Sequence, residues 1–119
     1  MASLGMEGPY ELTSEKIDAI ITRTSAGNYA LGYMNGDSFN VNYVGRSDND
    51  VKKRLKDWVG EYKKFKFSYA TSRKDAFEKE CRNYHDFGGS KSLDNKLHPE
   101  RPDDATWACP VCKIFGTIT

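Results

Sequence analysis

The sequence predicts an α+β domain in which a small three-stranded antiparallel sheet is flanked by helices. Two observations lead to this fold class. Aromatic and β-branched residues flank an Asn-Gly pair at positions 35 and 36, as in the two strands of a hairpin. On either side, apolar residues recur every three or four positions, as in amphipathic helices. The 119 residues suffice for one domain, which we expect over 11–119 after a flexible, Gly-rich lead over 1–10.

The first half of this domain is predicted to contain one helix and the hairpin. A capping residue at Thr13 and three isoleucines at helical spacing predict a short helix over 13–24. The hairpin strands are expected over 28–34 and 39–44, because an Asn-Gly pair readily takes the positive φ angles of a tight turn.

The second half is predicted to contain two helices separated by a strand. Apolar positions at helical spacing follow a capping residue near Asp48 and predict a helix over 50–62. Alternating aromatic and polar residues predict a half-buried strand over 65–69, and a second helical pattern covers 72–87. Two glycines end that helix, and the remaining residues are predicted to form mostly loop.

Composition limits the cellular setting. The mean hydropathy is −0.73, and no run approaches the ~20 apolar residues that a membrane span needs. The N-terminus lacks the basic and then apolar pattern of a secretory signal. We therefore expect a cytoplasmic protein without a membrane partner. Three cysteines, an odd number, also suit a reducing compartment better than a disulfide framework.

Positive charge is concentrated in the middle of the chain. Residues 46–82 hold twelve of the 18 Lys and Arg residues but only seven of the 17 Asp and Glu residues. Such a segment can neutralise backbone phosphates of nucleic acid, and the candidate contacts on its first helix are Lys52, Lys53 and Lys56. The alternative is an ordinary solvated helix face.

Two tripeptides and four single residues, taken in order, resemble the pattern of a known family. Gly27-Asn28-Tyr29 and Tyr43-Val44-Gly45 lie on the two hairpin strands, and Arg46, Arg54, Glu80 and Asn95 follow. This pattern resembles the GIY-YIG nucleases, whose two name-giving tripeptides stand at these places, and the resemblance covers residues 27–95. One residue departs from the pattern, because Asn28 replaces an apolar residue of the first tripeptide.

The resemblance implies a metal-dependent nuclease with a GIY-YIG-like fold. Glu80 would anchor Mg²⁺ or Mn²⁺, since Mg²⁺ takes one or two protein carboxylates and keeps several waters. Tyr29 would act as general base, with Tyr43 positioning the water or the phosphate. Arg46 and Arg54 would favour the phenolate form of Tyr29, and Arg54 would also bind phosphate in bidentate fashion. The resemblance places six residues in the catalytic set: Tyr29, Tyr43, Arg46, Arg54, Glu80 and Asn95.

A second set of residues has the spacing of metal ligands. Cys109 and Cys112 form a C-x-x-C pair that can give zinc two thiolates. Cys81 and His85, four apart on the second predicted helix, project from one face and would complete a Cys₃His site. His98 is the alternative fourth ligand. A closed four-ligand site would be structural, whereas a redox dithiol or plain unliganded cysteines are the other interpretations.

Two classes of function remain open from the sequence. The first is an active nuclease acting on nucleic acid, with DNA as the favoured form. The second is a catalytically weak nucleic-acid-binding or protein-interaction module with a zinc-supported tail. A chain of 119 residues leaves little room for a separate recognition domain, so sequence-specific targeting would require a homodimer or a partner protein.

Overall fold

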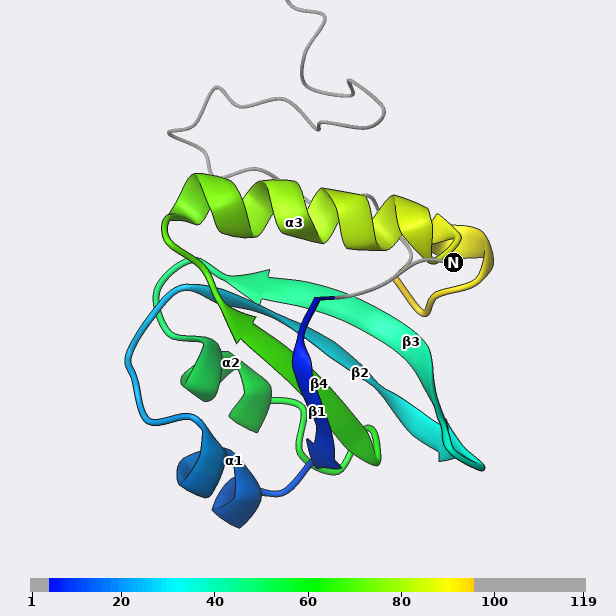
Figure 1. The fold of residues 1–119 in the computed structure, drawn as a ribbon, viewed down its shortest axis with the longest axis horizontal. Coiled ribbons are helices and arrows are strands. Elements are labelled where there is room, and N and C mark those ends of the chain that lie inside the picture. The colour runs from blue at the N-terminus through cyan, green and yellow to red at the C-terminus, as the bar shows by residue number, and fades with distance from the viewer. Residues whose placement is uncertain (1–4, 96–119) are drawn as a thin grey trace, which may run out of the picture.

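The computed structural model describes residues 5–95, in which one sheet is covered by helices on both faces (Figure 1). Helix α3 lies over one face, and the two short helices α1 and α2 lie against the other. The elements in order are β1 (Glu7–Glu11), α1 (Ser14–Ile20), β2 (Gly27–Asn35), β3 (Ser38–Ser47), α2 (Val51–Lys56), β4 (Lys64–Tyr69), α3 (Arg73–Asp86) and the 3-10 turn η1 (Gly89–Lys91). Within these residues no helix is long and apolar enough to cross a membrane.

The α+β class is confirmed, but the sheet has four strands and not the predicted three. Its order is β1-β4-β2-β3, and every neighbouring pair is antiparallel. The additional strand is β1, which was expected to belong mostly to the flexible lead. It pairs with β4 at the edge of the sheet, and Tyr10 packs against Phe65 at a ring-centroid distance of 5.6 Å. A five-residue edge strand containing Gly and Pro carries too little periodicity to be predicted.

Helix α2 is shorter than the sequence predicts. It starts as expected, because the Asp50 side chain accepts hydrogen bonds from the backbone N–H groups of Lys52 and Lys53. It ends at Lys56, well before residue 62. The chain then turns tightly, with Gly60 in the left-handed region at φ +92°. Trp58 and Tyr62 have helical spacing in the sequence but pack against the core from this turn, whereas Val59 is exposed.

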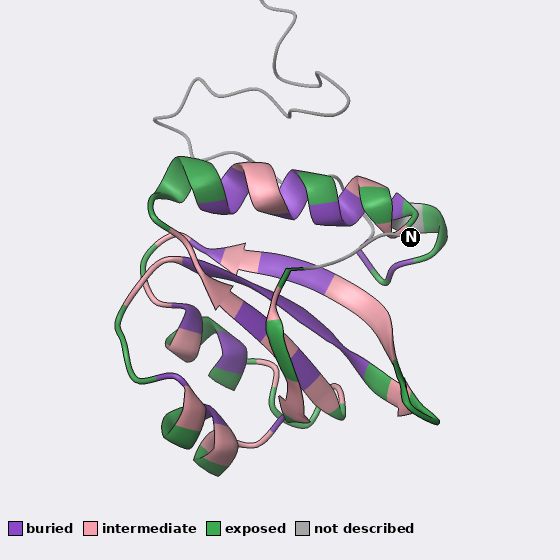
Figure 2. Ribbon diagram, in the orientation of Figure 1, coloured by how far each residue is buried: buried purple, intermediate pink, exposed green. Residues whose placement is uncertain are grey.

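The core has two parts, one on each face of the sheet. Residues of α1, α2 and the sheet bury one apolar cluster, and a smaller cluster lies beneath α3. Strand β2 is buried along most of its length because it lies between β4 and β3 and is covered on both faces (Figure 2). This central strand is therefore a rigid support for side chains at its ends.

The outer edge of β3 is covered by the segment that follows η1. The Asn95 side chain accepts a hydrogen bond from Val44 N at 3.0 Å and donates one to Val44 O at 2.8 Å. Asp94 N donates to Asn42 O at 2.5 Å. These bonds satisfy backbone groups that an edge strand would otherwise leave open. They fix the part of β3 that carries Tyr43 and Gly45.

Candidate active site

One cleft brings together five of the six predicted catalytic residues. It has a volume of about 290 Å³ and is lined by side chains from the sheet, from α2 and from α3. Its lining consists of Tyr29, Tyr43, Gly45, Arg46, Asp48, Arg54 and Glu80. The sixth predicted residue, Asn95, bonds instead to the backbone of Val44, so its observed contact is with the β3 edge.

Tyr29 reaches the cleft because its cross-strand partner is glycine. Gly45 lies opposite Tyr29 in the β2–β3 ladder. A Cβ atom at position 45 would collide with Cζ and Oη of the Tyr29 ring. Glycine therefore has a packing role here, since its missing side chain leaves the space through which the Tyr29 ring extends to the cleft.

The Tyr29 hydroxyl is buried and hydrogen-bonded. The residue is 3% exposed, and Trp58 Nε1 donates a hydrogen bond to Tyr29 Oη at 3.0 Å. Burial raises the pKa of Tyr29 well above its usual value, although the Trp58 donor and the nearby charge of Arg54 act in the opposite direction. The phenol is therefore strongly protonated at neutral pH.

Tyr43 lies next to Tyr29 on the neighbouring strand. The two rings stack with their centroids 6.5 Å apart and their planes inclined by 17°. Tyr43 is partly exposed, and burial together with the charge of Glu80 raises its pKa. Two protonated tyrosines thus lie side by side at the cleft, each able to donate or accept a hydrogen bond.

Glu80 is held by an ion pair with Arg46. Arg46 Nη1 lies 2.5 Å from Glu80 Oε1, and Arg46 Nε lies 3.0 Å from Asp48 Oδ1. The Arg46 and Glu80 side chains are only 12% and 10% exposed. Burial alone would lower the pKa of Arg46, but the two carboxylates outweigh it and raise the pKa. Arg46 is therefore occupied by its ion pairs with Glu80 and Asp48 and does not present its guanidinium to a phosphate.

Arg54 is the exposed cation of the cleft. It lies on α2 and lines both the cleft and a neighbouring hollow of about 440 Å³. The other residues that line this hollow are Ser47, Asn49, Asp50, Lys53 and Asp57, so it contains two carboxylates as well as two cations. Since a guanidinium presents a planar fork of donors, Arg54 is suited to bind a phosphate at the entrance of the cleft.

The cleft contains a donor set that fits a hard divalent cation. Glu80 and Asp48 bring two carboxylates into one small polar space. Mg²⁺ and Mn²⁺ prefer oxygen ligands, and Mg²⁺ commonly takes one or two carboxylates and completes its shell with water. Both carboxylates contact Arg46, so a metal ion here would share them with the guanidinium.

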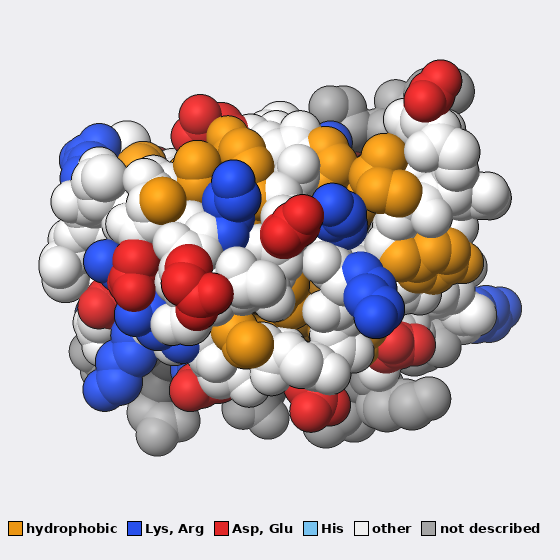
Figure 3. Space-filling view, turned by 90° about the horizontal axis from the view of Figure 1, so that it is seen from below, with side chains coloured by type: hydrophobic (Ala, Val, Ile, Leu, Met, Phe, Trp, Pro, Cys, Tyr) orange, Lys and Arg blue, Asp and Glu red, His pale blue; other side chains and the backbone are white. Residues whose placement is uncertain are grey.

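The three predicted nucleic-acid lysines do not have equal surroundings. Lys52 and Lys56 pair with Asp18 of α1, with Nζ to Oδ1 distances of 3.2 and 2.6 Å. Hydrogen bonds from Lys56 and Lys52 lower the pKa of Asp18. Lys53 faces the hollow beside Arg54. On the face drawn in Figure 3, Lys and Arg side chains are interspersed with Asp and Glu side chains and form no uniform basic patch.

The predicted zinc site falls mostly outside the described residues. Cys81 and His85 lie on α3, where Cys81 is buried and His85 is partly exposed. Cys109, Cys112 and the alternative ligand His98 lie outside residues 5–95. Within the described range, His, Cys, Asp and Glu side chains form no group of three or more that could hold a metal ion.

Asn28, the residue that departs from the family pattern, is fully buried beneath α3. Its Nδ2 donates a hydrogen bond to Ala76 O at 2.8 Å. Among residues 5–95, its Oδ1 has no hydrogen-bond partner. The side chain thus lies away from the cleft and links β2 to α3.

Sequence reasoning missed two residues of this site. Trp58 was assigned to the apolar face of a long helix, yet its N–H contacts the Tyr29 hydroxyl. Asp48 was considered only as a helix cap, yet it lines the cleft and binds Arg46. The position of Asp48, two residues after Arg46, was a signal for the contact between them. Nothing in the sequence indicated the contact between Trp58 and Tyr29.

Comparisons of the chain with family profiles, curated proteins and solved structures found no match. Function therefore has to be inferred from the geometry of the cleft.

Proposed function

We propose that the chain is a metal-dependent nuclease that hydrolyses phosphodiester bonds of nucleic acid by GIY-YIG-type chemistry. The observation that carries this proposal is the convergence of two tyrosines, two arginines and Glu80 on one polar cleft. The residues come from four separate elements, and the sequence resemblance predicted their grouping. Such a set supplies a proton acceptor, positive charge and a metal-binding carboxylate.

Five of the seven cleft residues have a direct role in this proposal. Arg54 binds the phosphate at the entrance, and Tyr43 positions the attacking water. The water oxygen forms a bond to phosphorus while the bond to the leaving oxygen breaks. The proton of the water passes to the phenolate of Tyr29, and the leaving oxygen takes a proton from solvent water. Mg²⁺ or Mn²⁺ held by Glu80, with Asp48 beside it, would supply positive charge to the phosphate oxygens in the transition state.

Tyr29 requires help to act as a base. Burial raises its pKa, so the phenolate is scarce at neutral pH. The hydrogen bond from Trp58 Nε1 and the charge of Arg54 stabilise the phenolate, and a divalent cation nearby would add to both. The rate should therefore rise with pH from neutral toward alkaline conditions.

Metal-dependent cleavage tests the proposal. Purified protein should nick or cleave DNA with Mg²⁺ or Mn²⁺. Glu80→Ala should abolish turnover while DNA binding is largely retained, because the metal held by Glu80 would stabilise charge that develops only in the transition state. Glu78→Ala is the matched control, since Glu78 lies on the same helix but lines a different pocket. Cleavage that survives both Glu80→Ala and Tyr29→Phe would show that the activity comes from another site or another protein.

A binding module without turnover is the second candidate function. The observation that favours it is the Arg46–Glu80 ion pair, which already neutralises the carboxylate that a metal would need. In this case the protein would bind nucleic acid with the strong salt dependence of phosphate contacts. Salt-sensitive binding without cleavage of duplex, single-stranded or branched substrates would support this candidate.

A structural zinc ion is a separate part of the proposal. Cys81 and His85 are one turn apart on α3, and Cys109 and Cys112 would complete the site. Stoichiometric zinc in protein purified without chelator is expected, with loss of the metal on His85→Ala but not on His98→Ala. The reverse result would make His98 the fourth ligand.

A further inference from the structure

Three aromatic rings form a cluster beside the cleft. Tyr43 of β3, Trp58 after α2 and Tyr62 before β4 are in mutual contact, and we refer to them as the aromatic cluster. Ring centroids lie 4.6 Å apart for Tyr43 and Trp58, 5.9 Å for Trp58 and Tyr62, and 6.5 Å for Tyr43 and Tyr62. Each ring is only partly buried and packs at the margin of the core. The cluster therefore presents aromatic surface to solvent.

Hydrogen bonds hold two of these rings in place. Trp58 Nε1 donates to Tyr29 Oη at 3.0 Å, and Tyr62 Oη donates to Asp94 Oδ2 at 2.8 Å. Asp94 is itself fixed by the bond from its backbone N–H to Asn42 O. The polar ends are thus paired within the protein, and the ring surfaces are pre-organised without need of a ligand.

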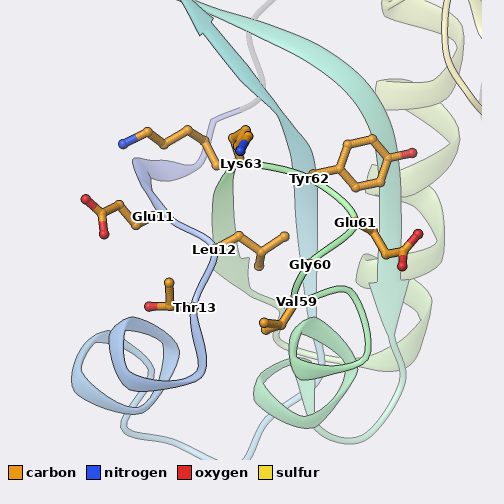
Figure 4. A pocket seen from close by; sticks show the side chains of 9 residues that line it. Glu11, Leu12, Thr13, Val59, Gly60, Glu61, Tyr62 and Lys63 are labelled. Carbon is orange, nitrogen blue, oxygen red and sulfur yellow. The ribbon is translucent and has the colours of Figure 1, made fainter.

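The aromatic cluster connects the cleft to a larger hollow. Tyr43 lines the cleft, whereas Tyr62 lines a hollow of about 550 Å³ near the start of β4. In Figure 4 the Tyr62 ring points away from Leu12 and Lys63, on the far side of the hollow from Glu11. Through Tyr43 and Tyr62 the aromatic cluster therefore borders both the cleft and the hollow.

Charge indicates what part of a ligand would lie over the rings. The formal charges that line the cleft cancel, but its two carboxylates are both paired with Arg46. Arg54 is the exposed cation there, and a guanidinium suits a phosphate. The hollow combines Glu11 and Glu61 with Lys63 and Lys64, so its formal charges cancel. A balanced hollow beside aromatic faces is suited to a neutral, flat group and is unsuited to a second phosphate.

We propose that Tyr43, Trp58 and Tyr62 form a stacking surface for an unpaired base next to the phosphate in the cleft. The substrate class is then single-stranded nucleic acid, or a strand whose base is turned out of the duplex. Aromatic rings beside a cationic groove bind single strands in this way, because every base has a face that stacks whereas paired bases are already stacked on each other. The inference rests on the proposed function, which places the phosphate in the cleft.

An abasic strand separates base contacts from phosphate contacts. Binding is measured by fluorescence anisotropy, without added divalent metal, for a single-stranded DNA oligonucleotide, the same length of strand with abasic sites, and a duplex. The full chain should bind the base-bearing strand roughly 5- to 100-fold more tightly than the abasic strand. Tyr62→Leu should remove most of this preference, whereas Tyr62→Phe should retain it because the ring remains.

Two further variants make the outcomes distinct. Tyr33→Leu removes an aromatic side chain that is 45% exposed elsewhere on β2 and should leave the preference unchanged, and thermal melting confirms that the variants fold. Equal affinity for both strands, tighter binding of the duplex, or a preference that survives Tyr62→Leu would overturn the stacking surface. Arg54→Ala should weaken the binding of the base-bearing strand and of the abasic strand by the same factor. If Arg54→Ala weakens the binding of neither strand, the phosphate does not bind in the cleft, and the base cannot then be placed beside it.

Discussion

Tyr29 and Gly45 face each other across the β2–β3 ladder, and the Tyr29 ring fills the space that a side chain at position 45 would need. The two positions belong to the two tripeptides that carry the family resemblance. Their relationship is steric, because the Tyr29 ring occupies the space left by the missing side chain of Gly45. The glycine of the second tripeptide is thus explained by packing, independently of any activity.

Gly45→Ala should therefore destabilise the protein and reduce turnover together. The added methyl group forces the Tyr29 ring or the strand to move, which should lower the free energy of unfolding by about 1–3 kcal/mol. Displacement of the hydroxyl should also slow cleavage. Urea unfolding and single-turnover cleavage rates measure the two effects.

Two variants control for this result. Gly36→Asn should be close to wild type, because nothing lies within 4 Å of a Cβ there and Asn tolerates the positive φ of +63°. Tyr29→Leu combined with Gly45→Ala should recover part of the lost stability relative to the sum of the single variants. Strict additivity of the two changes would contradict the steric relationship.

The Arg46–Glu80 pair predicts a competition between the guanidinium and a metal ion. Arg46→Met leaves Glu80 and Asp48 without their cation and should lower the free energy of unfolding by about 3 kcal/mol, as expected when one partner of a buried pair is removed. Mg²⁺ should then raise the melting temperature of this variant more than that of the wild type, because it binds carboxylates that Arg46 no longer shares.

The control for this competition removes the carboxylate as well. Arg46→Met combined with Glu80→Gln should lose most of the additional Mg²⁺ response. An equal shift of melting temperature in the wild type, the single variant and the double variant would mean that Glu80 does not bind the metal.

The sequence predicted the parts of this molecule that depend on local signals. The hairpin is confirmed, although its two turn residues are Gly36 and Asp37, because Asn35 pairs with Ser38 in the ladder. The helix predicted over 72–87 is confirmed as α3, because turn chemistry and apolar spacing act within a few residues. Strand β1 was missed, since its pairing with β4 joins segments more than fifty residues apart. Helix α2 was overextended because apolar spacing alone does not distinguish a helix from a turn that packs on the core.

The candidate site shows the same division. The resemblance named five residues that the structure brings to one cleft, so order along the chain was sufficient for them. It could not indicate that Trp58 donates to Tyr29, nor that Asn95 pairs with Val44, because both contacts depend on how distant segments pack. Charge density along the chain likewise could not separate Lys53 from its neighbours on α2.

The surroundings of these lysines predict unequal contributions to nucleic-acid binding. Lys53 borders the hollow beside Arg54, whereas Lys52 and Lys56 lie against Asp18. Lys53→Ala should weaken binding and reduce the slope of log affinity against log salt by about 0.9 for duplex DNA, the value for one phosphate contact. Lys52→Ala should change the slope much less. Similar slopes for the two variants would indicate that the ligand crosses α2 on another face.

The buried Asn28 predicts a stabilising substitution. The Asn28 Oδ1 atom is buried without a partner in the described part of the chain, and such an atom costs about 1–3 kcal/mol. Asn28→Leu removes this penalty and loses one hydrogen bond worth about 0.5–1.5 kcal/mol. Ala76 O lies within α3, so it retains its helical bond. The free energy of unfolding should rise by about 1 kcal/mol in urea titrations. Asn28→Asp, which adds a buried charge, should instead destabilise, and a loss of stability in Asn28→Leu would show that the bond to Ala76 outweighs the unpaired oxygen.

The buried tyrosines predict that stability falls in alkaline solution. Burial raises the pKa of Tyr29, Tyr43 and Tyr62 above the ordinary value, so near and above pH ~10 the unfolded chain loses phenolic protons that the folded chain retains. The folded state then binds more protons, and the free energy of unfolding decreases as pH rises, by up to about 1.4 kcal/mol per pH unit for Tyr29 alone.

Urea unfolding at a series of pH values from about 8 to about 11 measures this dependence of stability on pH. The decrease is expected at the upper end of the range, near and above the ordinary tyrosine pKa. Tyr29→Phe should flatten it, whereas Tyr33→Phe, at a side chain that is 45% exposed, should not. A slope that is the same in both variants would mean that burial does not hold the Tyr29 hydroxyl protonated in the folded protein.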